Sequence, residues 1–298
     1  MDNNRSKVVC FGEILWDILP GGTVPGGAPM NVAYHLHQLQ ESPVLITRVG
    51  NDEKGAALRN ILSEKQIDAS LLQTDINHPT GMVYGIADEK GDMKYEIVAP
   101  SAWDFIEADP NAMEKVRASS YFICGSLAAR NTASQQTLLT FLTAAKTNVV
   151  DINLRQPFFG ESLIGQLLQH AAIAKLNTDE LDLLSGWWNI NGDLRDRMNW
   201  LQQRFNLDTV IVTMGADGAA VFHEDSLYEH PGYKVNVADT VGSGDAFLAG
   251  FLHRRLQQDS ISAALNFASR LGAFVASHRG AWPAYTLGDL ELLPDQQT

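Results

Sequence analysis

Residues 238–252 read ADTVGSGDAFLAGFL, a glycine-rich turn followed directly by an apolar run with the composition of a helix. Gly242 and Gly244 allow a tight turn that residues with a side chain cannot adopt. Such a turn at a helix N-terminus points several backbone N–H groups, including that of Ser243, at one place where the helix dipole favours negative charge. The stretch therefore predicts an anion-binding site. Asp245 follows as either a helix N-cap or a catalytic carboxylate.

Strand-like and helix-like segments alternate on both sides of this stretch. In order they read KVVCFG, PMNVAYHLHQL, PVLITRVG, KGAALRNILSEK, SSYFICG, TLLTFLTAAK, NVVDIN, AIAKLN and DTVIVTMG. Such alternation is typical of parallel strands joined by crossover helices. We therefore expect an α/β fold, a three-layer α/β/α sandwich around a mostly parallel central sheet.

Two segments interrupt the alternation. EILWDILPGG follows the first strand directly, and residues 80–98 read as two strands joined by a turn around DEKGD, with no helix between. These strands would form a small lid over the carboxyl edge of the sheet, where open α/β sheets bind ligands and where a lid excludes water. A plain edge hairpin is the alternative. We expect one domain over residues 1–298, with lid strands at about 13–24 and 80–98.

The composition of the chain restricts the kinds of binding partner and the cellular compartment that we expect. The chain has 298 residues, 45% of them hydrophobic, enough for a sizeable core. Its net charge of −13 disfavours nucleic acid and anionic membranes but is compatible with a small phosphorylated ligand. No apolar run approaches the roughly 18 residues of a membrane span, and the N-terminus lacks a signal-peptide core, so we expect a cytoplasmic protein. Cys10 and Cys124 lie in strand-like runs and should be buried, reduced thiols.

Two further motifs follow predicted strands. Thr213, Gly215 and Gly218 in VIVTMGADGAAVF form either a hairpin turn or a loop that lets a nucleotide approach the backbone. Asn177 and Glu180 in AKLNTDELDLL match a helix capping box, yet at the same sheet edge Glu180 could hold a hydrated Mg²⁺.

The N-terminal third supplies candidate contacts to hydroxyl groups. Gly27 precedes a predicted helix in GGAPMNVAYHL, where backbone amides and Asn31 could bind hydroxyls. Asp17 is a carboxylate among apolar neighbours, suited to accept from sugar hydroxyls, with an exposed turn aspartate as the alternative. Arg155 in VVDINLRQP is either a cation near the site or a solvated surface arginine.

In combination and in this order, the motifs GGAPMNVAYHLHQL, NTDE, VTMGADGA and DTVGSGDAFLAGFL resemble the ribokinase-like (PfkB) carbohydrate kinases over essentially the whole chain. The resemblance implies ATP and Mg²⁺ as cosubstrates and phosphoryl transfer to a sugar hydroxyl. It makes Asp245 the base and the amides of Gly242, Ser243 and Gly244 the hole for charge on the transferring group.

The resemblance also implies roles for other positions. Asn177 and Glu180 would act through Mg²⁺ and its waters, and Arg155 would lie near the reacting phosphate. The remaining positions implied are Thr213, Gly215, Gly218 and Asn266 for the nucleotide, Asp17, Gly27 and Asn31 for the sugar, and Asp239 and Val241 for a monovalent cation such as K⁺.

Within the family, FGEILWDILP, GGAPMNVA, DINLR and SAWD look most like fructokinases. The leading prediction is an ATP-dependent kinase of the primary hydroxyl of fructose. A kinase of 2-keto-3-deoxygluconate or of another sugar or nucleoside is the alternative within enzymes, and a catalytically silent sugar-binding regulator is the alternative outside them. The exposed edges of a small lid would suit a homodimer.

Overall fold

A nine-stranded sheet forms the centre of the molecule, as seen in a computed structural model that describes residues 7–87 and 93–291. Its strand order is β13-β12-β11-β10-β9-β8-β1-β4-β5, and all neighbours are parallel except β11–β12 and β12–β13. The strands are β1 (Val8–Phe11), β4 (Pro43–Gly50), β5 (Leu72–Asp75), β8 (Tyr121–Gly125), β9 (Asn148–Asp151), β10 (Ile173–Asn177), β11 (Thr209–Thr213), β12 (Ala219–His223) and β13 (Ser226–His230).

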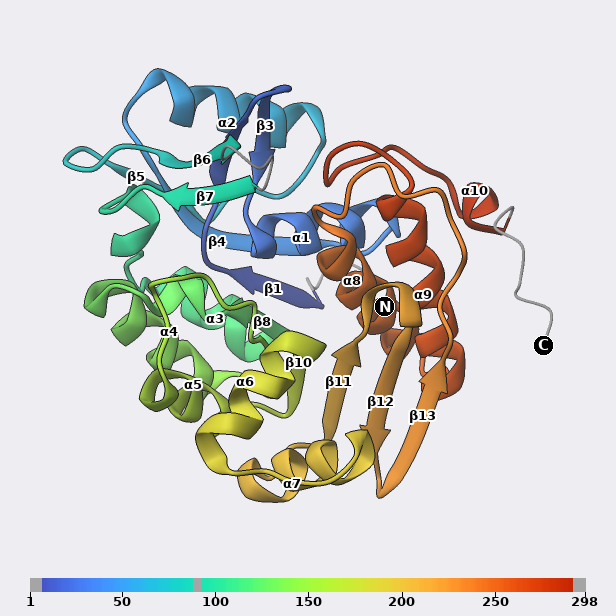
Figure 1. Ribbon diagram of the computed structural model, residues 1–298. Coiled ribbons are helices and arrows are strands. Elements are labelled where there is room, and N and C mark those ends of the chain that lie inside the picture. Colours follow the sequence, from blue (N-terminus) through green and yellow to red (C-terminus); the bar gives the residue numbers. More distant parts are fainter. Residues whose placement is uncertain (1–6, 88–92, 292–298) are drawn as a thin grey trace.

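Helices cover both faces of this sheet (Figure 1). One face packs against α3 (Pro110–Ala118), α4 (Thr132–Ala144), α5 (Glu161–Leu168), α6 (Thr178–Trp188) and α7 (Leu194–Phe205). The other packs against α1 (Ala28–Gln38), α2 (Glu53–Glu64), α8 (Ser243–Leu256) and α9 (Ile261–Ala276), with α10 (Leu287–Glu291) beside α9. Short 3₁₀ turns occupy η1 (Ala102–Phe105), η2 (Leu127–Ala129) and η3 (Gly215–Asp217). The predicted three-layer α/β/α fold is confirmed.

Side-chain alternation along the strands explains the two-sided core. In β1, Val9 and Phe11 join the layer of α3 to α7, whereas Val8 and Cys10 join the layer of α1, α2, α8 and α9. All four are fully buried, which is why the strand reads as a continuous apolar run. Cys10 and Cys124 are buried free thiols, and burial raises the pKa of both well above the ordinary range.

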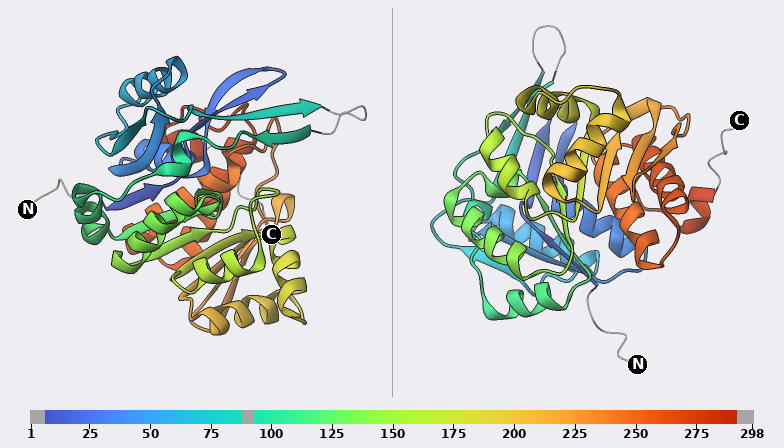
Figure 2. Two further views of the ribbon diagram at one scale, coloured as in Figure 1. Left: turned by 90° about the vertical axis from the view of Figure 1, so that its left-hand side faces the viewer. Right: turned by 90° about the horizontal axis from the view of Figure 1, so that it is seen from below.

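A second, four-stranded sheet, which we call the lid, stands apart from the body (Figure 2). Its order is β3-β2-β6-β7, from β3 (Gly22–Gly26), β2 (Leu15–Leu19), β6 (Gly81–Ala87) and β7 (Met93–Ile97). The two interrupting segments therefore pair with each other, since β2 lies parallel to β6. The predicted turn at 88–92 lies outside the described residues.

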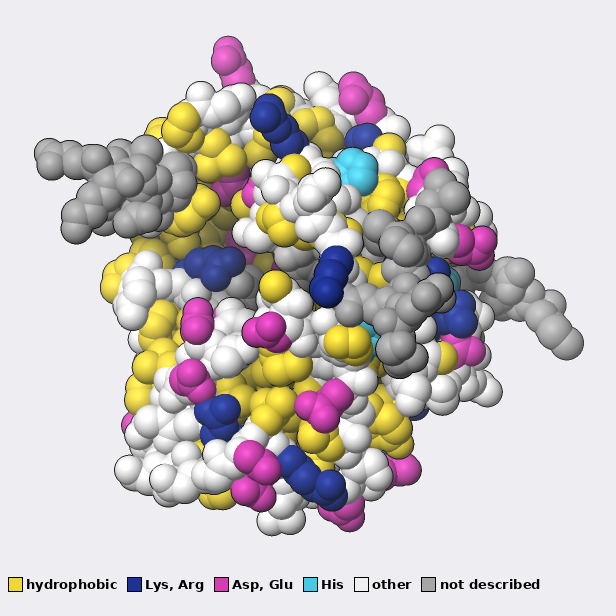
Figure 3. Space-filling model, turned by 45° about the vertical axis from the view of Figure 1, so that its right-hand side comes forward, with side chains coloured by type: hydrophobic (Ala, Val, Ile, Leu, Met, Phe, Trp, Pro, Cys, Tyr) yellow, Lys and Arg dark blue, Asp and Glu magenta, His cyan; other side chains and the backbone are white. Residues whose placement is uncertain are grey.

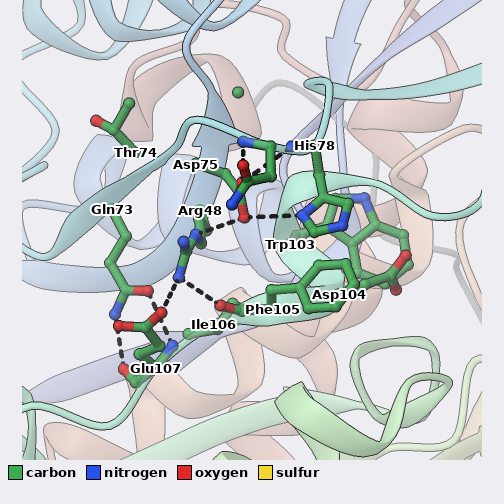
Figure 4. A network of polar contacts seen from close by, with 12 residues as sticks. Arg48, Gln73, Thr74, Asp75, His78, Trp103, Asp104, Phe105, Ile106 and Glu107 are labelled. Atoms are coloured by element: carbon green, nitrogen blue, oxygen red, sulfur yellow. Dashed lines mark hydrogen bonds and ion pairs between the residues drawn. The ribbon is translucent and has the colours of Figure 1, made fainter.

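A polar network ties together the two segments that flank the β6–β7 hairpin of the lid (Figure 4). Arg48 on β4 pairs with Asp75, which precedes this hairpin, at 2.9 Å, and with Glu107, which follows it, at 2.7 Å. In the same network His78 stacks on Phe105 with ring centroids 3.8 Å apart. One guanidinium thus contacts the chain on both sides of the β6–β7 hairpin.

No helix within residues 7–87 or 93–291 combines the length and the apolar character needed to cross a bilayer.

Candidate active site

A cavity of about 910 Å³ opens between the lid and the carboxyl ends of the parallel strands. Figure 3 shows it as a hollow with apolar side chains on its walls and acidic side chains within. The lid contributes Leu15, Asp17, Leu19, Val83, Tyr95 and Ile97, which alternate along their strands. Asp17 is the one charged side chain in that set, so the lid offers an apolar ceiling with a single carboxylate.

The glycine-rich turn forms part of the cavity lining at the start of α8. Gly242 is the helix N-cap with φ 77°, a left-handed conformation that favours glycine. A Cβ atom there would also lie 2.5 Å from the Cβ of Ala281. The first amides of α8 have no acceptor within the helix, although the amide of Ser243 donates to the carbonyl of Thr240 at 3.3 Å; Ser243 and Gly244 both line the cavity. This geometry is the one expected of the predicted anion-binding turn.

Asp245 lies in the first turn of α8, and the N-cap alternative for it is wrong because Gly242 occupies that position. Its Oδ2 instead accepts a hydrogen bond from Asn31 Nδ2 at 2.7 Å. Burial, followed by the charge of Asp151, raises the pKa of Asp245 to about 6 against the opposing effects of Lys175 and the Asn31 hydrogen bond. A carboxylate with a pKa near 6 is ionised at neutral pH yet basic enough to take a proton in a transition state.

A buried ion pair lies beside Asp245. Lys175 Nζ on β10 donates to both carboxylate oxygens of Asp151 on β9, each at 2.9 Å. Burial disfavours the charged form of Lys175, but the negative charges of Asp151, Asp245 and Glu180 outweigh it and raise the pKa of the amine. We did not predict this pair from the sequence. The available signal was a lysine inside the otherwise apolar strand IAKLN.

Asn177 and Glu180 form the capping box at the start of α6. Asn177 Oδ1 accepts from the amide of Glu180, and Glu180 Oε2 accepts from the amide of Asn177, both at 2.8 Å. Glu180 Oε1 accepts from the amide of Leu154 at 2.8 Å, and burial, then the charge of Asp151, raises the pKa of this carboxyl. Both oxygens are thus engaged by backbone, although the side chain still lines the cavity.

The candidate sugar residues meet at the lid side of the cavity. Gly27 has φ 112°, and a Cβ atom there would lie 2.4 Å from the carbonyl oxygen of Glu13. Burial raises the pKa of Asp17 to about 6, with Arg155 opposing the shift. Arg155 is exposed and lines the same cavity, as does Asn31, which is 5% exposed.

Glu13 is a cavity residue that we did not single out from the sequence. It is 2% exposed, its Oε1 accepts from the amide of Ala28 at 3.2 Å, and its Oε2 is buried without a partner among the described residues. Burial raises the pKa of this carboxyl to about 7. The sequence signal was an acidic residue in the apolar run CFGEILW.

The far end of the cavity carries the candidate nucleotide residues. Thr213, Gly215 and Gly218 line it, and the hairpin alternative also holds, because β11 and β12 are antiparallel around them. Gly218 has φ 92°, and a Cβ atom there would lie 1.9 Å from the carbonyl oxygen of His230.

Two predicted site residues lie outside the cavity lining. Asn266 is exposed, and its Oδ1 accepts from the hydroxyl of Tyr233, which does line the cavity. The carboxylate of Asp239 accepts from the amides of Val241 and Gly280 at 3.0 and 3.1 Å. The cavity brings together the other predicted residues, namely Asp17, Gly27, Asn31, Arg155, Asn177, Glu180, Thr213, Gly215, Gly218, Val241, Gly242, Ser243, Gly244 and Asp245.

Comparison with protein families and with curated sequences points to one family. A model described as pfkB family carbohydrate kinase matches residues 20–285. Fructokinase-2 of Oryza sativa subsp. japonica is 30% identical over 93% of this chain and 90% of its own length.

Solved structures agree with the sequence comparison. Fructokinase from Vibrio cholerae O395 with fructose, ADP and calcium is 26% identical with a TM-score of 0.82, covering 97% of this chain and 99% of that one. Aminoimidazole riboside kinase from Salmonella enterica, complexed with aminoimidazole riboside and an ATP analog, is 25% identical with a TM-score of 0.82, covering 96% and 99%.

Proposed function

The chain belongs to the pfkB family of carbohydrate kinases, and from that premise we propose that this ATP-dependent sugar kinase is a fructokinase acting on a primary hydroxyl. The observation that carries the proposal is the placement of Asp245, held by Asn31, at the foot of the anion-binding turn and in one cavity with Asp17 of the lid. The similarity to fructokinases supports fructose, while the similarity to a riboside kinase keeps other acceptors in the test.

In the proposed mechanism, ionised Asp245 accepts the proton of the attacking hydroxyl. The hydroxyl oxygen forms a bond to the γ-phosphorus, the bond from phosphorus to the bridging oxygen breaks, and its electron pair leaves with ADP. The amides of Gly242, Ser243 and Gly244 hold the charge that develops on the transferring group. Arg155, which lines the same cavity as Asp245, supplies a positive charge.

The sugar would be held between lid and body. Asp17 accepts from its hydroxyls, and Gly27 lets the backbone before α1 approach it closely. The apolar lid side chains Val83 and Ile97 exclude water, which lowers competing transfer of phosphate to water. A sugar acid would call for a further cation. Besides Arg155, the described lining holds Lys175, which is paired with Asp151, and Lys234, which follows Tyr233 in the sequence.

The nucleotide would lie along Thr213, Gly215 and Gly218, with Asn177 nearby and Asn266 acting from the rim through Tyr233. Mg²⁺ supplies positive charge on the phosphates when bound. Glu180 fits a water-mediated role better than direct coordination, because both its oxygens accept backbone hydrogen bonds.

A monovalent cation such as K⁺ would be bordered by Asp239 and Val241, since the Asp239 carboxylate joins the turn before α8 to Gly280.

A homodimer through the lid is supported by Tyr84 and Ile86, which are exposed on the lid strand β6. Sedimentation velocity tests this assembly.

The test measures ADP release with fructose, ribose, 2-keto-3-deoxygluconate and adenosine in parallel. Fructose should give the highest kcat/KM, and Asp245→Asn should retain sugar and ATP binding while turnover falls by about three or more orders of magnitude. A higher kcat/KM with another acceptor would show that fructose is not the preferred substrate. Near-normal turnover by Asp245→Asn would refute the assignment of Asp245 as the base. If no acceptor supports ADP release while sugar binding persists, a catalytically silent sugar-binding regulator would be favoured.

A further inference from the structure

A tryptophan outside every motif used so far reaches Asp245 through one intermediary. Trp282 follows α9, 37 residues after Asp245 along the chain. Its indole Nε1 donates to Asn31 Oδ1 at 2.7 Å, and Asn31 Nδ2 donates to Asp245 Oδ2 at 2.7 Å. Indole, amide and carboxylate form a single directed chain.

The direction of this chain is set by the indole. An indole N–H donates and does not accept, so it selects the amide orientation in which Oδ1 of Asn31 faces Trp282. The opposite orientation would place the amide N–H₂ against the indole N–H and the amide oxygen against the carboxylate of Asp245. Asn31 is 5% exposed, so little water is available to compensate for those two unfavourable contacts.

Trp282 is itself held in place by α1, the helix that carries Asn31. Its ring stacks on Tyr34 with centroids 5.0 Å apart and an interplanar angle of 7°. The Tyr34 hydroxyl donates to the carbonyl of Trp282 at 3.3 Å and to that of Pro283 at 3.1 Å. His35 Nε2 contacts the carbonyl of Ala281 at 2.9 Å, and burial lowers the pKa of this histidine to about 4, so the contact is made by a neutral ring.

We propose that Trp282 is a positioning residue for phosphoryl transfer: its indole N–H locks the amide of Asn31 so that the amide donates to Asp245. The inference rests on the proposed role of Asp245 as the base. It assigns no contact between Trp282 and substrate. The lock leaves the second hydrogen of Asn31 Nδ2 free to donate to a sugar hydroxyl, so both proposed tasks of Asn31 depend on one rotamer.

Loss of the indole N–H should make Asp245 harder to ionise. The hydrogen bond from Asn31 favours the carboxylate, whereas the other groups around Asp245 are unchanged by the substitution. Those groups are Asp151, which disfavours its charge, Lys175 and Arg155, which favour it, and the carboxyls of Glu13 and Asp17, whose own pKa values respond to Asp245.

The experiment compares Trp282→Phe and Trp282→Leu with the unaltered protein over a range of pH. Both variants lack the N–H, but only the second also loses ring stacking on Tyr34. We expect kcat to fall about 3- to 10-fold at neutral pH and the acidic limb of kcat to move up by about 0.5 to 1 pH unit in both. KM for the sugar should rise and KM for ATP should stay unchanged, because Asn31 faces the sugar.

Tyr34→Phe is the matched control, since it loosens the same loop by removing the hydroxyl that holds Trp282 and Pro283 yet keeps the indole N–H and the stacked ring. Its acidic limb should coincide with that of the unaltered protein, and thermal unfolding should report its loss of stability. If the limb moves equally in Tyr34→Phe, Trp282 has only a structural role.

A double-mutant cycle tests whether Trp282 acts through Asn31. In an Asn31→Ala background, Trp282→Phe should change kcat less than about 2-fold. Full additivity, or an unshifted acidic limb in Trp282→Phe, overturns the inference. Neither result bears on the base itself, since only substantial turnover by Asp245→Asn overturns that assignment.

Discussion

Replacing Lys175 by methionine should destabilise the protein far more than an exposed ion pair would. Lys175 and Asp151 have side chains that are 8% and 5% exposed, with both carboxylate oxygens at 2.9 Å from the amine. Methionine fills much of the same volume but leaves the carboxylate of Asp151 buried and unpaired beside Asp245 and Glu180. An uncompensated buried charge costs about 3–5 kcal/mol.

The sign of the pH dependence follows from the same geometry. Burial already raises the pKa of Asp245 to about 6 while Lys175 opposes the shift, so removal of Lys175 should raise this folded-state pKa further. A carboxyl group whose pKa is higher in the folded state than in the unfolded state destabilises the fold when it is ionised. The loss of stability should therefore grow as the pH rises. Urea unfolding without ligands, followed by tryptophan fluorescence at about pH 5.5 and about pH 8, measures both effects.

Two matched variants make the comparison sharp. Arg197→Met breaks the pair of Arg197 with Asp182, whose side chains are 21% and 60% exposed, and should cost no more than about 1 kcal/mol. The double variant Lys175→Met with Asp151→Asn removes both buried charges and should recover most of the lost stability. A Lys175→Met variant as stable as Arg197→Met, or a double variant no better than the single one, would refute the reasoning.

Three further predictions concern the reaction. Burial raises the pKa of both Asp245 and Asp17 to about 6, and the proposed mechanism uses both in the ionised form. We therefore expect kcat/KM for the sugar to fall as the pH drops through about 6, with a limb steeper than that of a single group; a flat profile down to about pH 5 would contradict this prediction. Chelation of divalent metal should abolish ADP release and added Mg²⁺ should restore it. Glu180→Gln can keep the α6 capping box but not the bond from the Leu154 amide as well; it should raise the Mg²⁺ concentration required without changing sugar binding. Full activity in a chelator would exclude the metal.

The sequence was sufficient for the fold and for most of the cavity, because parallel strands deliver their carboxyl ends to one edge. Motifs after β10 and β11 and before α1 and α8 could therefore be predicted to meet before the strand order was known. Local conformation decided one alternative that the sequence left open, since the left-handed backbone of Gly242 makes it the N-cap and frees Asp245 to face Asn31.

Contacts between distant segments were beyond sequence reasoning. The indole of Trp282 and the amide of Asn31 are 251 positions apart, and the pairing of Lys175 with Asp151 depends on β9 and β10 being neighbours. Neither the two-residue period of strands nor the 3.6-residue period of helices predicts these contacts. The contacts of Asn266 with Tyr233 and of Asp239 with Gly280 likewise join segments that are far apart in the sequence.

The anchoring of the lid has a consequence for how such a protein can diverge. Arg48 bonds to the segments on both sides of the β6–β7 hairpin, so a residue of the body, on β4, helps to set the separation of those two segments. Changes in the length or composition of that hairpin would alter what covers the acceptor while leaving the root of the lid, and the pairing of β2 with β6 that carries Asp17, in register. We therefore expect the length of this hairpin, and not only its side chains, to affect which acceptor the cavity admits, while the turn before α8 that carries Asp245 stays in place.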